Sequence, residues 1–160
     1  MRLLPIAGVV IAYFINATAM ATDYKAGSLA INKPWSRATP KGALMGVGYI
    51  AIKNNGTTPD RLIGGSVDVA DHFELHVTTI ENGIARMREL SDIEIKPGQV
   101  IEFKPGGSHV MFVNLKHPLS KGEHINGTLV FEHAGKVQID YSVEGIGAQR
   151  GPQEMEHMQR

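Results

Sequence analysis

Short runs of alternating apolar and polar residues, separated by turn signals roughly every 8 to 12 residues, limit what this chain can fold into. Beyond residue 21, no stretch has the sustained periodicity of a helix. We expect strands at 29–35, 45–53, 61–69, 73–80, 84–87, 93–95, 100–103, 109–113, 129–132 and 137–143. This pattern is typical of a single-domain, all-β fold, an antiparallel β-sandwich or barrel with Greek-key connections.

Two Asn-Gly-Thr triplets, at 55–57 and 126–128, fit an N-glycosylation pattern, and we interpret both as turns.

The first 21 residues differ in kind from the rest. A positive start at Arg2 precedes an almost wholly apolar run over 3–15, and the segment ends in Ala19-Met20-Ala21, a small-residue cleavage pattern. The apolar run is too short to cross ~30 Å of hydrocarbon as a helix. We therefore expect a cleaved secretory signal peptide over 1–21, followed by an exported domain over 22–144 that has no membrane span.

Composition excludes several classes of function. The chain has 16 basic and 16 acidic residues, and the basic ones are scattered, so no nucleic-acid-binding surface is indicated. It has no cysteine, which excludes a thiol reductase, a blue-copper electron carrier and a lipid-modified cysteine after the signal. Oxidising compartments outside the cytoplasm turn neighbouring thiols into disulfides. A soft-metal site in such a chain must therefore use methionine sulfur.

The stretch 73–111 concentrates neutral metal ligands, which occur in the order His76, Met87, His109 and Met111. Ten, twenty-one and one residues separate them. Thioethers are soft and uncharged and imidazole is borderline, so two His and two Met favour the monovalent ion Cu(I). We interpret these four residues as a candidate Cu(I) site.

A hairpin turn explains how the first pair can meet. Asn82-Gly83 is the strongest short-range hairpin signal. If these two residues form the loop, Thr78 faces Met87, and strand alternation makes His76 and Met87 diagonal neighbours on one face, roughly 7–8 Å apart.

The second pair needs no turn, because residues two apart on a strand point to the same side. This places His109 and Met111 on one face. The spacing leaves open whether the two pairs lie together. His72 is expected on the face of His76 but about 13 Å away along the strand, too far for the same ion. Met45 is expected to fill the core, as strand methionines usually do.

The pattern His76-x10-Met87-x21-His109-x-Met111 resembles the motif of the PCu(A)C family of periplasmic copper(I) chaperones. The similarity covers most of the chain after residue 21, notably 35–40, 48–56, 73–76, 83–88 and 103–111. In some members the residue after the first His is Met, whereas this chain has Val77.

The resemblance implies a cupredoxin-like antiparallel Greek-key β-sandwich that carries Cu(I) on the four residues. It also implies a periplasmic, monomeric, non-enzymatic copper chaperone. Its expected partners are the cytochrome c oxidase subunit that carries the dinuclear copper centre, Sco-type copper proteins, or both.

The segment 145–160 is polar, contains Gly and Pro, and is expected to be a flexible tail. It carries Met155, His157 and Met158. Some members of the resembled family have a His- and Met-rich extension that binds a second copper, including Cu(II), so we hypothesise a secondary copper site here. The alternative is a polar end without a role.

Three other interpretations remain open on the sequence alone. The protein could be a periplasmic copper storage or resistance protein, or a non-catalytic β-sandwich binding module with an accidental His/Met set. A copper oxidase would need an open coordination position and a substrate pocket, and the sequence indicates neither.

Overall fold

The computed structural model describes residues 24–151, and these residues form strands without any helix. No element of this part of the chain has the length and apolar character of a membrane-crossing helix. The strands are β1 (Tyr24–Ala26), β2 (Leu29–Arg37), β3 (Met45–Asn54), β4 (Asp60–Val67), β5 (Ala70–Glu81), β6 (Ile84–Leu90), β7 (Ile93–Ile95), β8 (Val100–Glu102), β9 (His109–Leu115), β10 (His124–Phe131) and β11 (Gly135–Glu144). The all-β prediction is confirmed.

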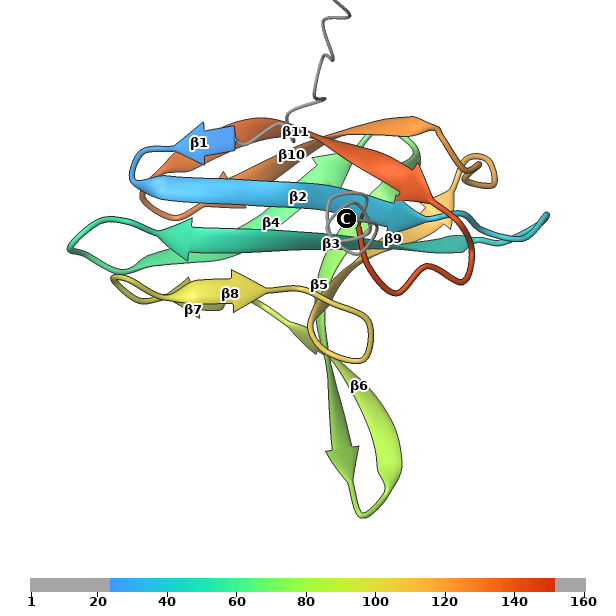
Figure 1. Ribbon diagram of the computed structural model, residues 1–160, viewed down its shortest axis with the longest axis horizontal. Coiled ribbons are helices and arrows are strands. Elements are labelled where there is room, and N and C mark those ends of the chain that lie inside the picture. Colours follow the sequence, from blue (N-terminus) through green and yellow to red (C-terminus); the bar gives the residue numbers. More distant parts are fainter. Residues whose placement is uncertain (1–23, 152–160) are drawn as a thin grey trace, which may run out of the picture.

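The strands form one continuous sheet in the order β6-β5-β9-β3-β2-β11-β10-β4-β7, with β1 beside β2 and β8 beside β3 (Figure 1). Neighbours pair in antiparallel fashion with one exception. β11 runs parallel to β2, where residues 142–144 pair with 35–37. The alternation of side chains did not indicate this pair, because parallel and antiparallel strands have the same two-residue period.

The sheet folds over itself to enclose the core. Phe112 on β9 and Tyr141 on β11 meet edge to face with ring centroids 5.4 Å apart, although β3 and β2 lie between these strands in the sheet. Gly48 makes room for both rings, since a Cβ there would lie 2.7 Å from Phe112 and 3.0 Å from Tyr141. Two apolar faces packed in this way give the sandwich-like architecture.

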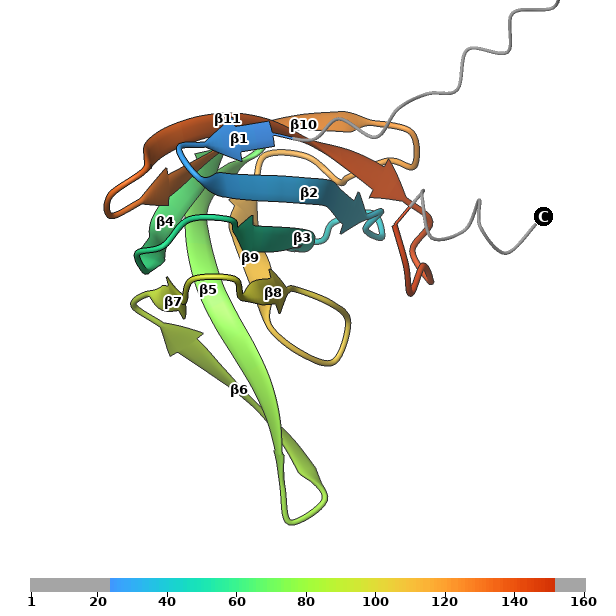
Figure 2. The same cartoon turned by 60° about the vertical axis from the view of Figure 1, so that its left-hand side comes forward.

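The hairpin of β5 and β6 projects away from the sandwich (Figures 1 and 2). Its turn residues, Asn82 and Gly83, have φ angles of 52° and 77°. Both lie in the left-handed region that a two-residue type I′ turn requires. Residues 84–89 of β6 are exposed, so this strand is held by its pairing with β5 rather than by the core.

Two expectations about local structure are wrong. Residues 126–128 lie within β10 and are not a turn, because β10 pairs with both β4 and β11 along them. Gly127 serves packing there, since a Cβ would lie 3.0 Å from Tyr141 and 3.2 Å from the Ser66 carbonyl. The first expected strand began at residue 29, yet a strand, β1, precedes it and pairs with β2.

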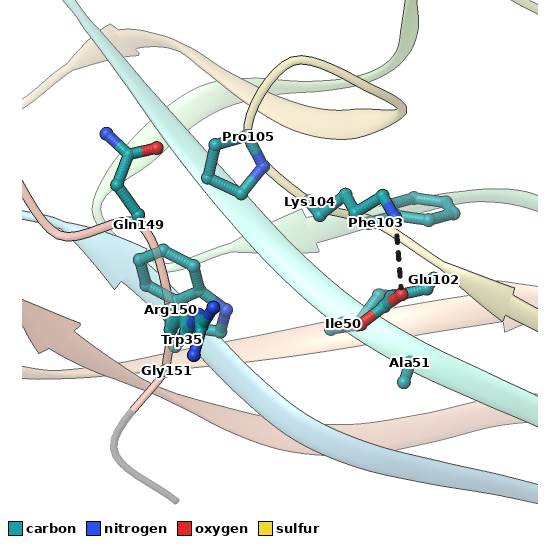
Figure 3. Close-up of a pocket in the computed structure, with 10 residues that line it drawn as sticks. All are labelled: Trp35, Ile50, Ala51, Glu102, Phe103, Lys104, Pro105, Gln149, Arg150 and Gly151. Atoms are coloured by element: carbon teal, nitrogen blue, oxygen red, sulfur yellow. Dashed lines mark ion pairs between the residues drawn. The ribbon is translucent and has the colours of Figure 1, made fainter. Parts of the chain in front are cut away.

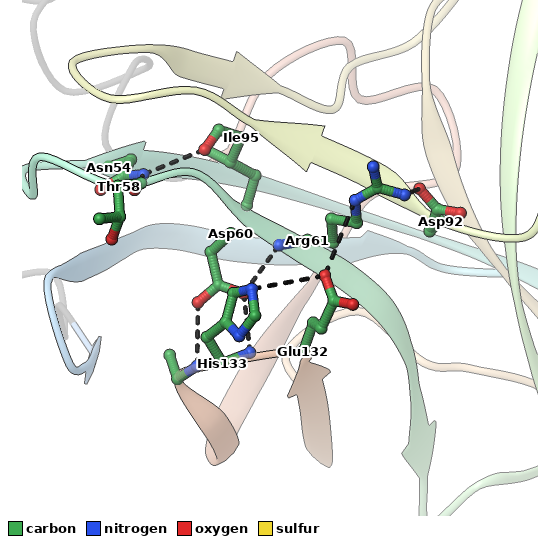
Figure 4. A network of polar contacts seen from close by, with 9 residues as sticks. Asn54, Thr58, Asp60, Arg61, Asp92, Ile95, Glu132 and His133 are labelled. Carbon is green, nitrogen blue, oxygen red and sulfur yellow. Dashed lines mark hydrogen bonds and ion pairs between the residues drawn. The ribbon is translucent and has the colours of Figure 1, made fainter.

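Buried polar groups tie the edge strands to the sandwich (Figure 4). The carboxylate of Asp60 accepts hydrogen bonds from the backbone N–H groups of Arg61, His133 and Ala134. The amide of Asn54 donates to the carbonyls of Thr58 and Ile95. These contacts satisfy backbone groups that the strands leave unpaired.

Residues 145–151 pack against β2 instead of forming the flexible tail expected from residue 145. Nε of Arg37 donates to the Ala148 carbonyl at 2.6 Å. Gly151 is buried against Trp35, and both line a small pocket with Pro105 (Figure 3). The tail residues Met155, His157 and Met158 lie outside the described residues.

Candidate metal centre

Strand alternation divides β5 and β9 into a core face and an outer face. Leu75, Val110 and Phe112 are buried in the core. The residues between them, Glu74, His76, His109 and Met111, therefore lie on the opposite face of the sheet. We call this surface of β6, β5, β9 and β3 the outer face.

The strand register brings the four predicted ligands together on the outer face. Thr78 pairs with Met87, as the Asn82-Gly83 turn predicted, so the predicted hairpin register is confirmed. His76 pairs directly with His109 across β5 and β9. The two His/Met pairs thus lie side by side on neighbouring strands, which the spacing alone had left open.

The two imidazole rings are close, with centroids 5.7 Å apart, and each has one occupied and one free nitrogen. Nε2 of His76 lies 2.8 Å from a carboxylate oxygen of Glu74, and Nδ1 of His109 lies 3.1 Å from the Gly107 carbonyl. Both partners are acceptors, so these nitrogens carry the protons. The other two, Nδ1 of His76 and Nε2 of His109, are buried without a hydrogen-bond partner.

Such orphaned nitrogens fit a metal ion well. Buried polar atoms nearly always have partners, so each exception needs an explanation. A histidine that binds a metal typically donates its other N–H to a carboxylate or a backbone carbonyl, as His76 and His109 do. Each ring therefore has the tautomer that ligation requires, with a lone pair on the nitrogen that lacks a partner.

Electrostatics keep His109 neutral. Burial lowers the pKa of His109 below its ordinary value of 6.5; its hydrogen bond to the Gly107 carbonyl opposes this shift, and the nearby His76 adds to it. Only the neutral imidazole binds a metal. His109 is therefore in its ligand form at neutral pH.

The thioethers lie nearer the solvent than the imidazoles. The Met87 residue is 54% exposed on the projecting hairpin, and Met111 is half-buried on β9, whereas His109 is only 5% exposed. An ion held here would sit at the protein surface, within reach of a second protein.

The donor set favours a soft ion. Within residues 24–151, no three side chains among His, Cys, Asp and Glu converge as a metal site. The outer face instead offers two imidazole nitrogens and two thioethers, a neutral set that suits Cu(I). The residues present thus fit the ion that their types predicted.

Two contributors to the site were not identified from the sequence. Glu74 orients His76, and its position two residues before His76 on the same strand was a usable signal. The Gly107 carbonyl accepts hydrogen bonds from Nδ1–H of His109 and from the backbone N–H of Thr78. A backbone carbonyl has no side-chain signal in the sequence that could have predicted this role.

The other histidines between residues 24 and 151 lie away from the centre. His117, His124 and His133 are exposed and contact carboxylates elsewhere, as surface histidines commonly do. His72 lies on the outer face, paired with Val113, four residues from His76. Met45 is 56% exposed, so its expected place in the core is wrong.

Comparison with known proteins identifies the family. A family model described as "Putative lipoprotein LpqE-like" matches residues 29–143. A relative from Leifsonia xyli subsp. xyli, named "Putative lipoprotein Lxx21020", is 32% identical over 121 residues, which are 75% of this chain and 72% of the relative.

Solved structures share the fold. The apo PCuAC domain of PmoF2 superposes with a TM-score of 0.70 at 31% identity and covers 81% of this chain and all of that domain. The copper-bound form of the same domain superposes with a TM-score of 0.68 at 31% identity and covers 78% of this chain and 98% of that domain. The Cu(I) form of DR1885 from Deinococcus radiodurans superposes with a TM-score of 0.62 at 25% identity and covers 84% of this chain and 87% of that protein. The chain therefore belongs to the LpqE-like family, and its domain is of the PCuAC type.

Proposed function

We propose that this protein is a copper chaperone that binds one Cu(I) through His76, Met87, His109 and Met111. One observation carries the proposal. The fold places the four side chains on one face and leaves one ring nitrogen of each histidine buried without a partner. The copper-bound PmoF2 domain and Cu(I)-DR1885 support it, because both share this fold.

The surface position of the site supports a carrier rather than a catalyst. The exposed Met87 lies on a hairpin that extends beyond the sandwich (Figure 2). A partner protein could contact this thioether and replace it as a ligand without unfolding the core. We expect release of Cu(I) by such stepwise exchange of ligands.

The cellular role follows from the family resemblance. The protein is expected in the periplasm after removal of residues 1–21, acting as a monomer without enzymatic activity. It would deliver copper to the dinuclear centre of cytochrome c oxidase, directly or through Sco-type proteins. Met155, His157 and Met158 of the tail would capture copper, including Cu(II), and pass it to the central site.

An anaerobic titration tests the central proposal. The exported protein is titrated with Cu(I) against a competing chelator, alongside His76→Ala, Met87→Leu, His109→Ala and Met111→Leu. We expect one tightly bound ion in the parent protein and weaker binding in each variant. Full affinity in both methionine variants would contradict the four-ligand site.

Transfer is tested separately. The Cu(I)-loaded protein is mixed with a purified oxidase copper domain or a Sco-type protein, and the copper content of each is measured after separation. Movement of copper to the acceptor supports a chaperone. Retention by the loaded protein would favour storage.

The proposed copper site of the tail is tested by truncation. Removal of residues 152–160 should lower the number of Cu(II) ions bound while the central Cu(I) affinity is kept.

A further inference from the structure

A second pair of soft ligands flanks the central site on the outer face. Val113 on β9 pairs with His72 of β5 on one side and with Met45 of β3 on the other. His72, Val113 and Met45 therefore form one row across three strands. Met111 lies two residues away on β9, so its side chain points to the same face as this row.

Exposure makes this pair unusual. Methionine is among the residues most often buried, yet Met45 is 56% exposed at the start of its strand. The cause is the packing of its neighbours: Gly46 and Gly48 take the core positions beneath Leu119, Phe112 and Tyr141. Every methionine in residues 24–151 thus lies on the outer face, and none fills the core.

The side chains of Met45 and His72 can reach the same ion as Met111. Neighbouring strands lie about 4.8 Å apart, so the Cα atoms of Met45 and His72 are about 10 Å apart across Val113. Each is a diagonal neighbour of Met111, at about 7–8 Å. Within the described residues, the His72 ring has no hydrogen bond or ion pair. The Glu74 carboxylate between the two histidines is engaged by His76.

We propose that His72 and Met45, together with Met111, form an outer Cu(I) station beside the central site. The inference rests on the proposed function, because Met111 belongs to both ligand sets. An ion enters on His72 and Met45, binds Met111, and then exchanges the first two ligands for the other three of the central site, His76, His109 and Met87. All ligands are neutral, so Cu–N and Cu–S bonds are exchanged while no electron or proton moves. The reverse sequence serves release.

Methionine methyl groups report the station directly. The exported protein is labelled with ¹³C at the methionine methyls and titrated anaerobically with Cu(I), which is diamagnetic. The first equivalent should shift the signals of Met87 and Met111. Further Cu(I) should shift Met45 and the ring protons of His72. In His72→Gln, half-maximal shift of Met45 should need at least about ten times more free Cu(I), in line with the loss of a ligand.

Two controls separate the station from the central site. Leu44→Ala removes an exposed apolar side chain next to Met45 and should leave both shifts unchanged. In Met45→Leu, the first equivalent should bind with unchanged affinity, while uptake from a chelator slows. A Met45 methyl that stays fixed while Met87 and Met111 shift overturns the station alone. Fixed Met87 and Met111 signals at the first equivalent contradict the proposed function itself.

Discussion

His76 and His109 are direct partners across β5 and β9, with ring centroids 5.7 Å apart and one buried, unpartnered nitrogen on each ring. Thirty-two residues separate them in the sequence, yet the sheet places them side by side. Their protonated nitrogens face Glu74 and the Gly107 carbonyl, so the remaining lone pairs are available. Met87 and Met111 lie on the same face, and in the proposed site their thioethers complete a neutral donor set for Cu(I).

Met87→Leu separates ligation from stability. Because Met87 is 54% exposed, we expect the free energy of unfolding to change by less than about 0.5 kcal/mol. Cu(I) affinity should fall at least about tenfold, since a thioether is lost. Urea unfolding and chelator competition measure the two effects. Ile80→Ala, on the same hairpin face and 75% exposed, is the matched control and should keep full affinity.

Glu74→Ala should disturb His76 without touching the metal directly. The carboxylate lies 2.8 Å from Nε2 and holds the tautomer that leaves Nδ1 free. We expect Cu(I) affinity to fall by about 10- to 100-fold, and ¹⁵N spectra of the apo protein to show a mixture of His76 tautomers. Glu74→Gln should largely restore both, because its side-chain carbonyl still accepts the hydrogen bond from Nε2–H of His76. A single His76 tautomer in the spectra of Glu74→Ala would contradict the role of Glu74 in fixing that tautomer.

Gly83→Ala tests the turn that sets the hairpin register. Gly83 has a φ of 77°, where a side chain costs about 1–2 kcal/mol. We expect a loss of stability of this size in urea unfolding, together with weaker Cu(I) binding if the hairpin register shifts away from Thr78–Met87. Asn82→Gly keeps the permitted conformation and serves as the control. Equal stability of Gly83→Ala and the parent would contradict the left-handed conformation of residue 83.

Stability of the apo protein should depend on pH through His109. Its pKa is lowered by burial, so the unfolded chain binds a proton more readily than the folded one. The stability that neutral His109 contributes is fully present above pH 6.5, the ordinary pKa of histidine. It is lost as the pH falls from there through the lower pKa that His109 has in the folded state. Urea unfolding at pH 7.5 and 5.5 should show this loss. In His109→Gln the difference between the two pH values should be smaller.

Gly151→Val should release the C-terminal segment from β2. A Cβ at Gly151 would lie 2.9 Å from the Trp35 ring. Trp35 is the single tryptophan of the chain, so its fluorescence reports the contact, and we expect a red shift as water reaches the indole. Gly147→Val is the control, because nothing lies within 4 Å of a Cβ there. Identical spectra for the two variants would show that residues 145–151 do not cover Trp35.

Local chemistry in the sequence was enough to predict several features of this protein. Alternation located most strands, because the side-chain period of a strand is two. Asn82-Gly83 determined the hairpin register and with it the shared face of His76 and Met87, since only these residue types readily adopt the left-handed turn. The absence of cysteine indicated thioether ligands, because methionine is then the one source of a soft sulfur donor.

Only the tertiary structure decided which strands are neighbours and which face is the core. Nothing local links β5 to β9, so the pairing of His76 with His109 comes from the packing of the whole sheet. The same packing turned Met45 outward, because the rings of Phe112 and Tyr141 fill the core position above Gly48. Alternation along a strand predicts that the strand has two faces. The burial of large side chains across the sandwich then determines which of the two faces lies in the core.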